Sequence, residues 1–218
     1  AETAHLAAAT VARALEAMDY RLASKEFFDT LEVEAEAAVV QSLALEQGIN
    51  FYYPSEGRVR MSFDEVTTAA EIETVVSIFA AAKGKKAKAV KAVTESCVPT
   101  ALRRQSPYLQ EPVFNAYRSE SALMRYIKKL ELRDISLANS MISLGSCTMK
   151  LNAAALMQPL SLAGFQNMHP FAPADQAKGY MDLIAGLEQD LATITGFAAC
   201  SLQPNSGAAG EYTGLMVI

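Results

Sequence analysis

The stretch SLQPNSGAAGEYTG, Ser201–Gly214, decides how this chain is interpreted. It passes through the turn-prone Gln203–Asn205 into the small residues Ser206–Gly210, and then into a segment that can continue as a helix. Small residues let a backbone approach a ligand closely, and the first free N–H groups of a helix attract an anion. The stretch therefore predicts a phosphate-binding turn to which the Ser206 hydroxyl adds a donor. It contains neither the Walker pattern nor the dinucleotide-binding glycine pattern, and a turn that only caps a helix explains the same residues.

The composition limits the other classes of function. A chain of 218 residues with 51% hydrophobic residues can form one large or two small domains with a core. Its net charge of −5 argues against a nucleic-acid partner. Cys97, Cys147 and Cys200 lie far apart, and His5 and His169 are the two histidines, so we expect neither a metal site nor a disulfide framework. No apolar run is long enough to cross a bilayer, and we expect a soluble protein in a reducing compartment without a membrane partner.

The first 82 residues alternate helical and strand patterns. Helical spacing appears over residues 2–18 and 34–47, a strand pattern over 27–33, and a hairpin pattern over 49–63 with its turn at Pro54–Gly57. Asp64 can cap a further helix, whose core face contains Ile72, Val75, Val76 and Phe79. This order predicts a small α/β unit in which the helices cover one side of an antiparallel sheet.

The middle of the chain contains the clearest boundary. Four lysines within Lys83–Lys88 favour a solvated linker over a basic recognition patch. Beyond several prolines, apolar spacing predicts a helix that Ser119 caps. A second helix is predicted from Asp175 until just before Gly196.

Three motifs follow one another in the second half of the chain. They are LGSCTMKLN at 144–152, HPFAP at 169–173 with Gln176, Gly179 and Tyr180 after it, and QPNSGAAGEY at 203–212. In this order they resemble the LGSCTMKLN, HPFAP…QAxGY and QPNSGAQGEYAGL segments of the glycine decarboxylase family, the P-proteins of the glycine cleavage system. The resemblance is strong from about Tyr108 onward and looser before it. Three ordered motifs are far more specific than any one of them.

The resemblance implies an α/β fold made of pieces of the aminotransferase type, which is fold type I of pyridoxal phosphate (PLP) enzymes. Residues 1–82 would be the small α+β C-terminal subdomain of the family's first, catalytically silent half. Residues 83–135 would form a linker and helical arm, and residues 136–218 the incomplete start of the second-half PLP-binding domain. The chain begins without Met inside a helical pattern, so we expect a processed or excised piece of a longer chain.

The resemblance also implies an activity, namely PLP-dependent decarboxylation of glycine with transfer of the aminomethyl group to the lipoyl arm of H-protein. Glycine and lipoylated H-protein are then the partners, the full-length chain is a dimer, and the location is the bacterial cytoplasm or the mitochondrial matrix. From the phosphate-binding turn alone, two alternatives stay open. These are another aminotransferase-fold PLP enzyme and a non-catalytic interaction or regulatory module.

The cofactor-binding residues implied by the resemblance lie in the turn. Ser206, Gly207 and Ala208 would hold the cofactor phosphate, with the Ala209 N–H group as a further donor. Ala209 stands where the family has Gln, so a side-chain contact is lost there while backbone donation remains.

The remaining site residues come from the two other motifs. Ser146, Cys147 and Thr148 would face the substrate, and His169 would line the channel for the lipoyl arm or transfer a proton. Without the resemblance, Cys147 is better interpreted as a packing cysteine, because no histidine lies near it in the sequence. In this fold type the Schiff-base lysine follows the phosphate loop by several strands. We therefore expect it beyond Ile218, and we expect the 218-residue piece alone to be inactive.

Overall fold

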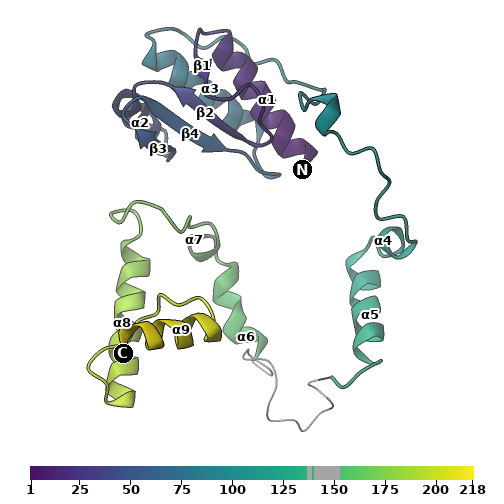
Figure 1. Ribbon diagram of the computed structural model, residues 1–218, viewed down its shortest axis with the longest axis vertical. Coiled ribbons are helices and arrows are strands. Elements are labelled where there is room, and N and C mark those ends of the chain that lie inside the picture. Colours follow the sequence, from purple (N-terminus) through teal and green to yellow (C-terminus); the bar gives the residue numbers. More distant parts are fainter. Residues whose placement is uncertain (137–138, 140–152) are drawn as a thin grey trace. The chain divides into compact units, whose positions relative to one another are not determined.

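The chain separates into two units, residues 1–107 and 108–218, which are described separately (Figure 1). The computed structural model describes residues 1–136, 139 and 153–218. In this part of the chain, all strands lie in the first unit, and the second unit is helical. The domain boundaries expected after residues 82 and 135 follow from the family resemblance and stay a prediction.

A four-stranded antiparallel sheet forms one layer of the first unit. The strand order is β1-β2-β4-β3. The strands are β1 (Arg21–Leu22), β2 (Thr30–Glu34), β3 (Tyr52–Ser55) and β4 (Arg58–Ser62). β2 and β4 pair from Thr30 opposite Ser62 to Glu34 opposite Arg58. Since successive side chains of a strand point to opposite faces, one face carries the buried Leu31, Val33, Val59 and Met61. The other face carries polar and charged side chains.

Three helices cover the buried face of this sheet: α1 (Glu2–Glu16), α2 (Ala37–Glu46) and α3 (Ala69–Ala82) (Figure 1). Phe79 of α3 is fully buried in the core they share with the sheet. The ring of Tyr20 meets it edge-on at 5.3 Å between centroids, and the Tyr20 hydroxyl donates to the Phe79 carbonyl oxygen at 2.7 Å. The predicted small α/β unit with helices on one side of an antiparallel sheet is confirmed.

Two local predictions in this unit are wrong. Asp64 does not cap α3, because the N-cap is Thr68, whose hydroxyl accepts from the Glu71 N–H while the Glu71 carboxylate accepts from the Thr68 N–H. This reciprocal capping box satisfies two free donors and so outcompetes a single Asp. The hairpin exists, but its turn is shorter than expected, because Pro54 and Ser55 belong to β3 and Ser55 lies opposite Arg58.

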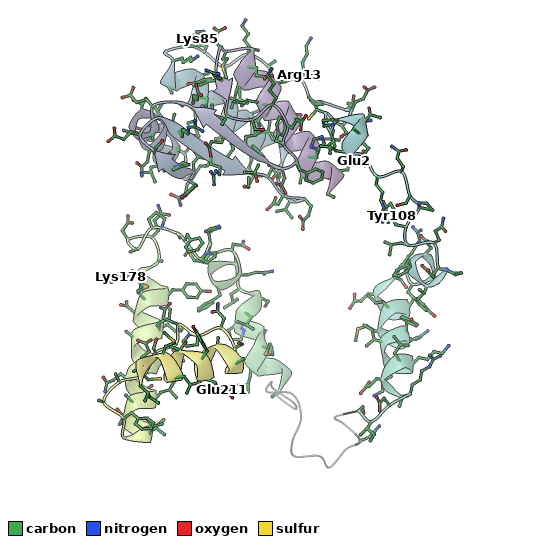
Figure 2. All side chains as sticks on the ribbon, viewed as in Figure 1. Glu2, Arg13, Lys85, Tyr108, Lys178 and Glu211 are labelled. Carbon is green, nitrogen blue, oxygen red and sulfur yellow. The ribbon has the colours of Figure 1, made fainter. Side chains whose placement is uncertain are left out.

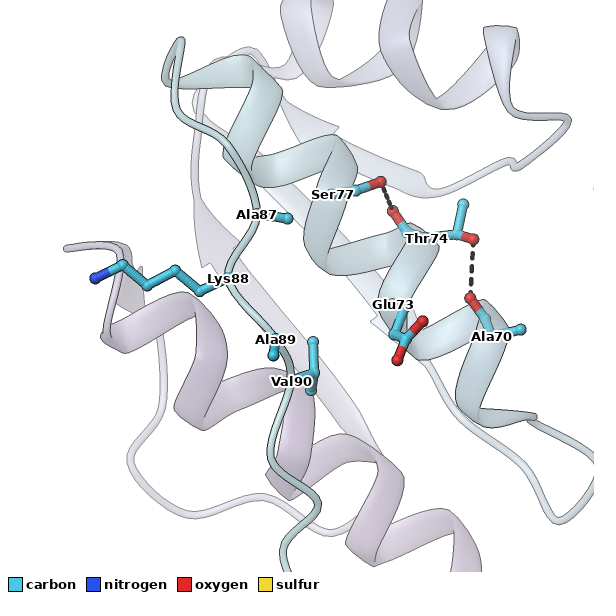
Figure 3. A pocket seen from close by; sticks show the side chains of 8 residues that line it. All are labelled: Ala70, Glu73, Thr74, Ser77, Ala87, Lys88, Ala89 and Val90. Atoms are coloured by element: carbon cyan, nitrogen blue, oxygen red, sulfur yellow. Dashed lines mark hydrogen bonds between the residues drawn. The ribbon is translucent and has the colours of Figure 1, made fainter.

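The segment after α3 packs back onto the first unit. Lys83 donates through Nζ to the carbonyl oxygens of Met18 and Asp19, at 2.8 and 2.7 Å. Residues 85–98, which we call the strap, follow, and their part from Ala87 to Val90 runs beside α3 (Figure 3). Val90, Ala92 and Val93 of the strap line a pocket together with residues of α1 and α3. Val93 of the strap is buried, and its N–H donates to the Thr10 hydroxyl of α1 at 2.9 Å. Although the lysines of this segment are exposed, the strap itself is held by specific contacts.

The second unit contains short and long helices in its described part. Their bounds are α4 Val113–Ala116, α5 Glu120–Glu131, α6 Ala154–Met157, α7 Ala163–Gln166, α8 Lys178–Thr195 and α9 Gly207–Val217. Two short 3₁₀ helices, Thr100–Leu102 in the first unit and Gln158–Ser161 in the second, complete the set of described helices. The Ser119 hydroxyl accepts from the Ala122 N–H at 3.2 Å, which confirms the predicted cap of α5. α8 ends at Thr195, just before Gly196 as predicted, and Gly196 caps it with a left-handed φ of 74°.

Removing the Phe79 ring should strongly destabilise the first unit. We expect Phe79→Ala to lower its free energy of unfolding by about 3–5 kcal/mol, since a fully buried ring leaves a cavity. Denaturant unfolding followed by circular dichroism measures this loss. The control in the same unit is Val66→Ala, because Val66 is 73% exposed and its loss should change stability by about 0.5 kcal/mol or less. Equal effects of the two substitutions would contradict the placement of the core.

The open face of the sheet should make stability sensitive to acid. Hydrogen bonds from Arg58 and then Arg60 hold the pKa of Glu32 below its ordinary value of 4.5. A carboxyl group whose pKa is lower in the folded chain stabilises the fold above the unfolded pKa and loses this contribution as pH falls through the folded pKa. We expect Glu32→Gln to flatten the fall in stability below pH 4.5. Denaturant titrations at a series of pH values measure this, with Glu34→Gln as a control for loss of one strand carboxylate.

Candidate functional site

The predicted phosphate-binding turn begins helix α9. Ser206 is the N-cap of this 11-residue helix, and its Oγ accepts from the Ala209 N–H at 3.1 Å. The Gly210 N–H donates to the Ser206 carbonyl oxygen at 2.9 Å and so begins the regular helical hydrogen bonding. The sequence predicted a helix after the small residues Ser206–Gly210, whereas the helix already begins at Gly207, inside them.

The first turn of α9 leaves two backbone donors for a ligand. The N–H groups of Gly207 and Ala208 precede the first intrahelical bond, and both residues are exposed. A Cβ atom at Gly207 would meet no atom within 4 Å, so nothing covers the backbone there. The Ala209 N–H, expected as a further donor, is engaged by Ser206 Oγ. This donor set, with the dipole of α9 behind it, suits a phosphate group.

The loop before the turn is attached to helix α8. The Leu202 N–H donates to the Glu188 carboxylate at 2.9 Å, and the Gln203 N–H donates to the Ser201 hydroxyl at 3.3 Å. Glu188 thus holds the chain that leads into the turn. Sequence reasoning missed this role, because nothing in the spacing of 14 residues distinguishes Glu188 from other acidic residues of the helix.

His169 lies in an exposed loop between α7 and α8. Its Nδ1 accepts from the Phe171 N–H at 3.0 Å, so in the neutral ring the proton is on Nε2. The ring of Phe171 lies 5.9 Å from that of His169. Among the described residues, no hydrogen bond or ring contact joins His169 to the turn at Ser206. Ser146, Cys147 and Thr148 lie outside the described residues.

Other kinds of site find little support in the described residues. A shallow pocket between α3 and the strap is lined by Glu73, Thr74 and Ser77 on the helix side (Figure 3). The hydroxyls of Thr74 and Ser77 donate to the carbonyl oxygens of Ala70 and Thr74, at 2.9 and 2.8 Å.

Within the described ranges, no group of three potential ligands could hold a metal ion. No helix among these residues has both the length and the apolar character that crossing a membrane requires.

Known proteins resemble this chain over its whole length. A protein named glycine dehydrogenase (decarboxylating) from Flavobacterium johnsoniae is 50% identical over 219 residues, which cover 100% of this chain and 23% of that relative. The corresponding protein of Bacteroides thetaiotaomicron is 51% identical over 94% of this chain and 22% of its own length. The mitochondrial protein of Pisum sativum is 42% identical over all of this chain and 21% of its own length. The chain thus spans between a fifth and a quarter of these relatives.

A family model describes the first part of the chain independently of these relatives. Residues 1–79 match the model described as glycine cleavage system P-protein. This range contains the sheet, α1, α2 and most of α3, where the three sequence motifs give no information. The family match and the similarity of the whole chain confirm the resemblance seen in the motifs: this chain is similar to a part of the glycine cleavage system P-proteins.

Proposed function

We propose that this chain is part of a PLP-dependent glycine decarboxylase that transfers the aminomethyl group of glycine to the lipoyl arm of H-protein. The observation that carries the proposal is the identity of 42–51%, over 94–100% of the chain, with proteins named glycine dehydrogenase (decarboxylating). Similarity to one named enzyme over the whole chain does not favour another aminotransferase-fold enzyme or a non-catalytic module.

The turn at Ser206 has the chemistry that a cofactor phosphate requires. Two exposed N–H groups, those of Gly207 and Ala208, point out of the first turn of α9, and a hydroxyl stands beside them. Backbone amides bind an anion without a basic surface, so the net charge of −5 does not oppose this role. Ser206, Gly207 and Ala208 are therefore our proposed phosphate ligands, with Ala209 holding the Ser206 side chain in place.

The residues of the other motifs complete the proposed site. When bound, PLP supplies an electron sink for the electrons left on the substrate as carbon dioxide departs. Ser146, Cys147 and Thr148 are proposed to bind and orient glycine through small polar groups. His169 is proposed to line the path of the lipoyl arm, where its exposed ring offers the Nε2 proton as a donor.

The setting of the protein is proposed from its relatives. Bacterial relatives and a mitochondrial relative from pea are both similar to this chain, which supports the bacterial cytoplasm or the mitochondrial matrix. We propose a dimer of the longer protein, with glycine and lipoylated H-protein as its partners.

A segment exchange tests the proposed function directly. The matching segment of the Flavobacterium johnsoniae relative is replaced by this 218-residue chain, and exchange of labelled bicarbonate into glycine is measured with PLP and H-protein. Because the two segments are 50% identical, we expect the chimera to keep exchange activity within about tenfold of the unmodified relative. A folded, PLP-loaded chimera without exchange activity would overturn the proposal.

Substitutions in the same chimera test the phosphate site. We expect Ser206→Ala to weaken PLP binding about tenfold, through loss of one hydrogen bond and of the helix cap. Gly207→Asp should weaken it more than about a hundredfold, because a carboxylate would face the phosphate. Absorbance titration with PLP measures both effects.

Two matched variants control for indirect effects on α9. Ser206→Thr keeps a capping hydroxyl, and Gly214→Asp places the same carboxylate about 10 Å further along the helix. Both should bind PLP nearly as the parent chimera does. If Ser206→Ala and Gly207→Asp also bind PLP normally, the turn only caps a helix.

A further inference from the structure

A buried histidine and an exposed cysteine meet where the strap crosses α1. His5 is 2% exposed, and its Nδ1 lies 2.7 Å from the carbonyl oxygen of Phe28. Because a carbonyl oxygen only accepts, Nδ1 carries a proton and donates it. The ring stacks on that of Phe28 at 5.1 Å between centroids. The lone pair of the neutral ring is therefore on Nε2.

Cys97, at the end of the strap, occupies the Nε2 side of this ring. Its N–H donates to Nε2 at 3.1 Å, and its Sγ lies 3.5 Å from the same nitrogen. Ninety-two positions separate the two residues in the sequence. Cys97 is exposed, in contrast to the buried His5. The pair combines the thiol of an exposed residue, an unprotonated ring nitrogen and a carbonyl group that fixes the orientation of the ring.

This arrangement has the parts of an activated nucleophile, in which a base contacts the thiol and a third group orients the base. We propose that Cys97 is a thiol-modification site that reacts with low-molecular-weight disulfides, with His5 as the base. The Cys97 sulfur attacks one sulfur of the disulfide, and its proton passes to His5 Nε2, whose lone pair gives up the hydrogen bond from the Cys97 N–H for the duration of the step. The disulfide bond breaks, its second sulfur leaves as a thiolate, and the proton passes on to it. Cys97 is oxidised to a mixed disulfide, and the leaving sulfur is reduced to a thiol.

The carbonyl oxygen of Phe28 supports the transfer of the proton to the ring. The Phe28 carbonyl oxygen, already hydrogen-bonded to Nδ1, stabilises the positive charge that develops on the ring as the sulfur attacks. Before the reaction, His5 Nε2 accepts a hydrogen bond from the Cys97 N–H. This bond both anchors the strap and positions the Cys97 sulfur.

The chain offers an internal comparison. Cys200, in the loop before α9, is half-buried, and no described histidine contacts it. The test exposes the 218-residue chain to glutathione disulfide at pH 7.5, stops the reaction with acid and measures modification of each cysteine by peptide mass spectrometry. We expect Cys97 to react at least about tenfold faster than Cys200, and faster in the folded chain than in urea. A Cys97 rate that rises when the chain unfolds would overturn the proposal.

A variant separates activation from simple exposure. In His5→Gln, the amide can still donate to Phe28 and accept from the Cys97 N–H, but it cannot take up a proton. We expect modification of Cys97 to slow by about tenfold or more while the Cys200 rate stays unchanged. If this variant does not fold, the comparison of folded and urea-treated parent chain decides the question. An unchanged Cys97 rate in a folded variant would show that His5 only anchors the strap, which contradicts the proposal.

Discussion

Burial of Phe79 between the helices and the sheet is the constraint on which the first unit depends. Its ring fills the core that α1, α2 and α3 share with one face of the strands, and Tyr20 contacts both the ring and its carbonyl group. Lys83, four residues after Phe79, places its Nζ 4.1 Å from the centroid of the Tyr20 ring. Packing at Phe79 thereby fixes where the chain leaves α3. The strap, and with it the position of Cys97 beside His5, follows from that exit point.

The helices in the described part of the second unit depend on different interactions. α5, α8 and α9 have no buried residue among those described, and apolar side chains such as Leu187 and Leu215 are 44% and 72% exposed. What defines these helices is their ends, through Ser119, Gly196 and Ser206. Side-chain caps and a left-handed glycine satisfy the free backbone groups of a helix without any core. These are local interactions, which explains why the Ser119 cap of α5 and the end of α8 before Gly196 were accessible from the sequence.

The same distinction separates what the sequence predicted from what it did not. The core face of α3 and the hairpin follow from periodicity, and the structure has both. Asp64 and Thr68 were two candidate N-caps of α3, and their spacing alone did not show which of them caps the helix. The contacts of the strap join Val93 to Thr10 and Cys97 to His5 across more than 80 residues, and no short-range pattern encodes such pairs. In the candidate site, a turn followed by a helix was predictable, whereas the helix start at Gly207 and the Glu188 contact were not.

The Ser206 cap and the proposed phosphate site do not compete for the same atoms. A hydroxyl has two acceptor lone pairs and one donor hydrogen, and the cap uses acceptor capacity for the Ala209 N–H. The hydrogen of the same hydroxyl stays available to donate to an anion. With Ala209 engaged, the Gly207 and Ala208 N–H groups are held in the helical geometry that directs them outward. Ser206 would therefore have the same conformation whether it only caps the helix or also binds phosphate. In the proposed site, the capped turn is already arranged for the ligand before the ligand binds.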